Sequence, residues 1–148
     1  MTGVQTCVFR SSAGLRLHPL ESVGAAADRL TNLKRVAAGF IDWAVEMDCL
    51  HAALFHSDFA QRRPVPAKYD PVVRLTDFIR AGNDDDAFSV RDPHPTARLL
   101  FAVIHEAADA VLEGDDRMRT VVALGRLLDR VLLPDSSSYG EGASDGRR

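Results

Sequence analysis

Residues 99–112 read LLFAVIHEAADAVL, and they are the most apolar segment of the chain. The apolar side chains cover nearly the whole circumference of a helix instead of a single stripe. A helix of this kind has to be buried on two sides. We therefore predict a helix over residues 94–113, and we expect one of its sides to pack against a second subunit.

The segments before this helix also have helical periodicity. Apolar residues recur at spacings of three and four over residues 19–47, which predicts one long helix. We expect Asp48 to cap a short second helix that carries Cys49 to His56. A third helix is predicted over residues 71–81, because Asp70-Pro71 is a favourable start and Gly82 a favourable end.

A final helix is predicted from Asp115 or Asp116 to about Leu133, where Pro134 follows. The sequence has no alternating apolar run and no hairpin dipeptide, so no strand is expected. About five helices joined by short loops make an all-α, antiparallel helical bundle. We expect residues 19–133 to form this domain, between a leader of residues 1–18 and a Ser- and Gly-rich, disordered tail of residues 134–148.

The leader has a separate explanation. Residues 1–11 read MTGVQTCVFRS. This resembles the translation of a common sequencing adapter, GTG ACT GGA GTT CAG ACG TGT, followed by GTC TTC CGA TCT after the loss of one base. We therefore expect Met1–Ser11 to be an artefact that has no part in the fold, and the natural protein to extend further upstream.

Composition limits the possible functions. The 148 residues fit one domain, and the net charge of -3 argues against electrostatic binding of nucleic acid by the chain as a whole. Cys7 and Cys49 form neither a disulfide framework nor a CxxC metal motif, and we expect Cys49 to be a small core residue. Since no apolar run could span a bilayer and no secretory signal is visible, we expect a cytoplasmic protein without a membrane partner.

Two groups of residues were considered as metal sites. His105-Glu106-Ala107-Ala108-Asp109 resembles the His-Glu-x-x-His motif of zinc hydrolases, but Asp replaces the second His and no third ligand is evident. We instead expect a buried His105 that bonds to Asp109 or to a backbone carbonyl. The spacing of His51, His56 and Asp58 does not place them on one helical face, so no metal is expected there either.

No phosphate-binding loop, nucleophile elbow or Cys–His pair is present. We therefore expect the chain not to be an enzyme and to carry no cofactor. A small helical metal-assisted enzyme remains the alternative from another functional class.

The large aromatic residues either fill the core or line a pocket between helices. If they line a pocket, its walls would be Trp43, Phe55, Phe78 and Phe101, and His105 and Asp109 would be its polar anchors. A small apolar or aromatic molecule is the ligand that such a lining would take.

Four segments together resemble the C-terminal domain of TetR-type transcriptional regulators. EMDCLHAALF at residues 46–55 parallels the family pattern E-H-P-A-L-Y-x-L-L-F, with Met47-Asp48 in place of His-Pro. The segments 79–93, which ends in Asp-Pro, and 100–114 parallel the family's next helices, with Glu106 where Gly is usual. LLDRVL at residues 127–132 parallels the final helix. The resemblance covers residues 19–133.

The resemblance implies an effector-sensing and dimerisation domain. The family's N-terminal helix-turn-helix has no counterpart here, so DNA would be bound only through that missing domain. The last two helices are expected to form a four-helix bundle with a second copy, across an interface that includes Leu99, Val103, Leu124, Leu127 and Val131. A dimerisation module without a ligand is a further alternative.

Overall fold

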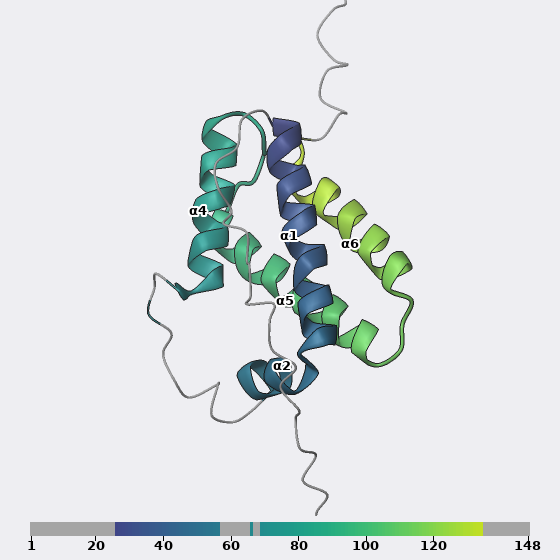
Figure 1. Cartoon of the computed structure of the whole chain (residues 1–148). Helices are drawn as coiled ribbons and strands as arrows, with labels where there is room; N and C mark the ends of the chain where they lie inside the picture. Colours follow the sequence, from purple (N-terminus) through teal and green to yellow (C-terminus); the bar gives the residue numbers. More distant parts are fainter. Residues whose placement is uncertain (1–25, 57–65, 67–68, 135–148) are drawn as a thin grey trace, which may run out of the picture.

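The structure, a computed structural model, describes residues 26–56, 66 and 69–134. In these ranges it contains five helices and no strand, which confirms the all-α bundle (Figure 1). The helices are α1 (Ala26–Glu46), α2 (Asp48–Phe55), α4 (Pro71–Asp84), α5 (Pro93–Leu112) and α6 (Arg117–Leu132). The expectations for the leader, for the first helix before Ala26, for Asp58, and for the tail after Pro134 concern residues outside those that the structure describes.

Helix α5 occupies the centre of the bundle. It packs against α1, α4 and α6, while the short α2 follows α1 at one end of the molecule (Figure 1). The side of α5 that faces these helices carries buried residues at spacings of three and four: Ala97, Leu100, Ile104 and Ala108.

Two of the predicted helix starts are confirmed by hydrogen bonds. The Asp70 carboxylate accepts from the Val72 amide at 2.8 Å at the start of α4. The Asp116 carboxylate accepts from the Arg119 amide at 2.8 Å, which selects Asp116 over Asp115 as the cap of α6. The prediction for Asp48 was wrong, because Met47 is the N-cap residue of α2 and Asp48 already lies inside the helix.

Gly82 does not end its helix as predicted. Helix α4 continues to Asp84, and Gly82 lies buried in its last turn. A Cβ atom at this position would lie 2.0 Å from Cδ2 of Phe88, so the glycine is needed for Phe88 to pack against the helix. The Asn83 side chain bridges the loop between α4 and α5. It donates to the Val90 carbonyl at 2.7 Å and accepts from the Val90 amide at 3.1 Å.

Burial corrects two further expectations. Leu124 is 5% exposed and belongs to the core of its own chain, so it is not available as an interface residue. Its packing follows from its position on the same face of α6 as Leu128 and Leu132, which are fully buried. Cys49 was expected to be a small core residue, but it is exposed on α2 and disulfide-bonded.

Ion pairs hold α6 against α1. Arg117 contacts the Asp42 carboxylate through Nε at 2.5 Å and through its terminal nitrogen at 2.7 Å. Lys34 Nζ lies 2.6 Å from Asp129 Oδ1. Asp42 and Asp129 are therefore engaged within the bundle. None of the helices in the described ranges is long and apolar enough to cross a membrane.

Candidate functional site

Aromatic and imidazole rings from three helices gather where α1, α2 and α5 meet. Helix α5 contributes Phe101, His105 and Asp109, which lie on one face because they are four residues apart. The other two helices contribute rings at similar spacings: Phe40 and Trp43 from α1, and His51 and Phe55 from α2. We refer to these seven residues as the ring cluster.

His105 lies at the centre of the ring cluster. Its ring centroid is 4.2 Å from that of Phe55, 4.4 Å from that of Phe101 and 4.7 Å from that of Phe40. Its Nδ1 lies 3.2 Å from the Phe101 carbonyl oxygen. Because a carbonyl only accepts hydrogen bonds, Nδ1 carries the proton, and Nε2 of the neutral ring is an acceptor. That Nε2 is buried and has no hydrogen-bond partner in the described structure.

Burial keeps His105 neutral. The loss of solvent lowers the pKa of His105 from its ordinary value, and the hydrogen bond that His105 donates to the Phe101 carbonyl opposes this effect in part. The positive charges that His51 and His56 can carry lower the pKa of His105 further, whereas Asp109 raises it. The sequence offered Asp109 or a backbone carbonyl as the partner of His105, and the structure shows the carbonyl of Phe101.

His51 is the most deeply buried imidazole of the cluster, at 1% exposure. It packs against Phe40, Trp43 and Phe55 with centroid distances of 5.8, 6.0 and 5.2 Å. Burial lowers the pKa of His51, Asp109 raises it and His56 lowers it again. Its Nε2 is buried without a hydrogen-bond partner, and its Nδ1 faces Asp109.

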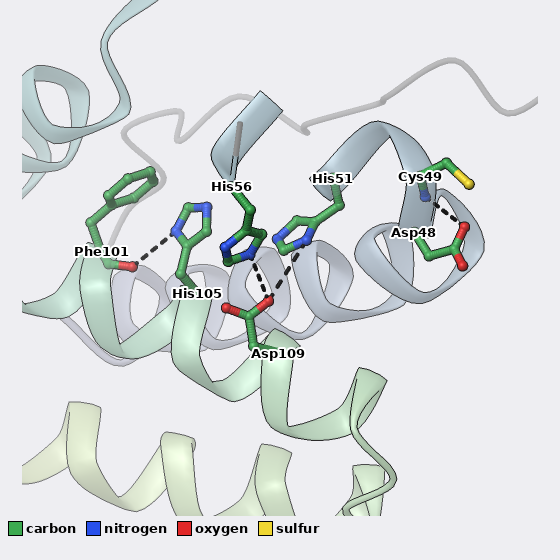
Figure 2. A network of polar contacts seen from close by, with 7 residues as sticks. All are labelled: Asp48, Cys49, His51, His56, Phe101, His105 and Asp109. Carbon is green, nitrogen blue, oxygen red and sulfur yellow. Dashed lines mark hydrogen bonds and ion pairs between the residues drawn. The ribbon is translucent and has the colours of Figure 1, made fainter. Parts of the chain in front are cut away.

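Asp109 connects the cluster to the solvent. Its Oδ1 lies 3.1 Å from His56 Nε2 and 3.7 Å from His51 Nδ1 (Figure 2). The His56 side chain is 52% exposed, so this edge of the cluster is open to water. Asp109 therefore contacts His51 of α2 and His56, the C-cap residue of α2, rather than the His105 that precedes it by one turn of α5.

Five of the six residues predicted to bind a ligand come together in this cluster: Trp43, Phe55, Phe101, His105 and Asp109. Phe78 does not join them. It is buried on α4 and packs against Phe88, with the ring centroids 5.8 Å apart. Sequence reasoning missed Phe40 and the convergence of His51 and His56 on Asp109. The three-residue spacing of Phe40 and Trp43 was the one available signal.

A shallow pocket lies elsewhere, between α1 and α6. Its volume is about 270 Å³, and its walls include Lys34, Ala38, Val121 and Gly125. This is slightly smaller than the roughly 300–1,000 Å³ of typical small-molecule sites. Lys34 and Asp129, which both line this pocket, form an ion pair with each other.

The predicted interface residues lie away from the ring cluster. Leu99 and Val103 each precede a cluster residue of α5 by two positions, which places them on the opposite side of the helix. Leu99 is 68% exposed, and Leu127 and Val131 on α6 are 38% and 37% exposed.

Comparisons of this chain with protein-family models, with curated proteins and with solved structures found no match.

Proposed function

We propose that this chain is the ligand-sensing and dimerisation domain of a TetR-type regulator, whose DNA-binding helix-turn-helix is not part of it. The observation that carries the proposal is the ring cluster, which unites five residues expected to bind an effector around a buried, unpartnered acceptor, His105 Nε2. In the intact regulator, effector binding would change the spacing of two DNA-reading domains and so release the operator.

The chemistry of the cluster defines the effector class. Its walls are aromatic rings, which favour a flat apolar molecule. A buried acceptor that lacks a donor is costly, by about 1–3 kcal/mol. An O–H or N–H group on the effector would satisfy His105 Nε2 and remove this cost. The proposed effector is therefore a small aromatic molecule with one hydrogen-bond donor, and it enters by displacing rings that now contact one another.

Trp43 provides the test, because it is the chain's single tryptophan and belongs to the cluster. Phenol and toluene are a matched pair that differ in the donor group. Phenol should change Trp43 emission at lower concentration than toluene does. Replacing His105 by Phe should remove the difference. Equal responses to the two probes in the unmodified chain would contradict a role for His105 as anchor. No response to either would favour the dimerisation module without a ligand.

The dimer part of the proposal rests on exposed apolar side chains. Leu99, Leu127 and Val131 lie on the outer flanks of the last two helices, where a second copy would cover them. Val103 is partly buried beside them. Large contiguous apolar surfaces are uncommon on monomers, and a two-fold pairing of α5 and α6 would bury this one as a four-helix bundle.

Sedimentation of the unmodified chain at micromolar concentration should show a dimer. Replacing both Leu99 and Leu127 by Glu should give a folded monomer, because both side chains are exposed within one chain. Val45→Glu is the matched control, since Val45 is a 46% exposed apolar residue on α1, and this variant should remain a dimer. A monomeric unmodified chain, or an unchanged dimer in the double variant, would contradict the interface.

A further inference from the structure

We infer that His51, His56 and Asp109 form a binding site for one divalent transition-metal ion, between α2 and α5. One atom from each residue, two imidazole nitrogens and a carboxylate oxygen, lies within 4.8 Å of the others (Figure 2). The site requires α2 and α5 of one chain. It therefore stands whether or not the proposed dimer forms and whether or not an aromatic effector binds.

His56 is within hydrogen-bond distance of Asp109, whereas His51 is not. His51 Nδ1 lies 3.7 Å from Asp109 Oδ1, which is too long for a hydrogen bond. His56 Nε2 lies 3.1 Å from the same oxygen. Two ligand atoms that each lie about 2.0–2.1 Å from a tetrahedral zinc ion are roughly 3.3–3.4 Å apart. The two observed separations bracket this value, so an ion can be held with small side-chain adjustments.

The donor set indicates the class of ion. Imidazole nitrogen suits Zn²⁺, Ni²⁺, Cu²⁺ and Fe²⁺, whereas Mg²⁺ and Ca²⁺ take oxygen ligands. The Asp109 carboxylate supplies one negative charge toward a divalent ion. His51 is buried to 1% exposure and holds its Nδ1 toward this point, which is the position that a neutral imidazole needs to donate its lone pair.

The exposed side of the site leaves room for ligand exchange. His56 is 52% exposed, so the ion can enter from solvent and keep water in its remaining coordination positions. Binding would strengthen the connection between the end of α2 and α5, two elements that ring packing and the His56–Asp109 contact already hold together. The ion would therefore fix α2 against the ring cluster.

The test is calorimetric titration of Zn²⁺ into the untagged, chelator-stripped full chain, with Co²⁺ absorption as a second readout. We expect one ion per chain, visible Co²⁺ bands of a tetrahedral or five-coordinate complex, and a higher melting temperature with Zn²⁺. His56→Ala and Asp109→Asn should each weaken binding at least tenfold, since loss of even an outer-shell partner costs about 10–100-fold. His56 is exposed, so this variant should keep the fold.

His94→Ala is the matched control, because His94 is an exposed histidine of α5 outside the site. It should bind Zn²⁺ as the unmodified chain does. Absence of Zn²⁺ and Co²⁺ binding at submillimolar concentration would overturn the inference. Binding that persists unchanged in a folded His56→Ala chain, or that is lost equally in His94→Ala, would also overturn it.

Discussion

His56 Nε2 on α2 lies 3.1 Å from Asp109 Oδ1 on α5, although the two residues are 53 positions apart in the chain. Asp109 also faces the buried His51. The His56–Asp109 contact therefore marks the edge of the ring cluster that is open to solvent. It makes α2 part of the candidate site and not merely an extension of α1. Whether the site binds an aromatic molecule, a metal ion or both, this pair lies at its entrance.

The metal-free chain should lose stability on mild acidification. Burial lowers the pKa of His51 and of His105 from the ordinary value of 6.5. Between the folded pKa and 6.5, the unfolded chain binds protons that the folded chain does not. The free energy of unfolding should therefore fall as the pH drops below about 6.5, by at most about 1.4 kcal/mol per pH unit for each histidine. Above that range these two groups should contribute no slope.

Urea unfolding between pH 5.5 and 7.5 in the presence of a chelator measures this effect. His105→Phe should reduce the slope, because it removes one titrating group and keeps a ring in the cluster. A stability that stays constant or increases on acidification through this range would contradict the burial argument.

Gly82→Ala should destabilise the chain by about 1–3 kcal/mol, because its Cβ would lie 2.0 Å from Phe88 and force the ring to move. Gly39→Ala is the matched control within a helix. No atom lies within 4 Å of a Cβ added at Gly39, so this change should stabilise the chain by roughly 0.5–1 kcal/mol. Denaturant unfolding of both variants checks the opposite signs. If Gly82→Ala proved neutral, Phe88 would not pack as described.

Leu124 and Leu127 should differ in what their truncation affects. Leu124→Ala should lower the free energy of unfolding by about 2–5 kcal/mol, because this side chain is 5% exposed within one chain. Leu127→Ala removes a side chain that is 38% exposed, so its effect should appear mainly in self-association. Unfolding and sedimentation of both variants over a range of protein concentrations separate the two effects. Similar losses for both would contradict the assignment of Leu124 to the core.

Asp115 and Asp116, the two aspartates before α6, should differ in how much each stabilises the chain. Asp116→Ala removes the carboxylate that accepts from the Arg119 amide and should cost about 0.5–2 kcal/mol. Asp115→Ala should cost less, because the helix cap stays intact. Thermal unfolding of the two variants side by side gives the comparison. An equal loss for both would indicate that charge near the helix start, and not the cap, is responsible.

Much of the fold follows from local sequence patterns. Apolar spacing predicted all five described helices, and capping chemistry predicted starts at Asp70 and at Asp116 or Asp115, because both depend on residues a few positions apart. Local patterns failed at Gly82. A glycine near a helix end can stop the helix or admit a neighbour, and only the position of Phe88 shows that it does the second.

The candidate site, like the fold, could be predicted from the sequence only in part. The sequence by itself placed Phe101, His105 and Asp109 on one face of a helix, because a four-residue spacing fixes that relation. Only the tertiary structure brought His51 and His56 to Asp109 and separated Phe78 from the rest. Those relations depend on how α2 and α4 pack against α5. Such packing is set by many weak contacts between distant segments, and no local spacing records it.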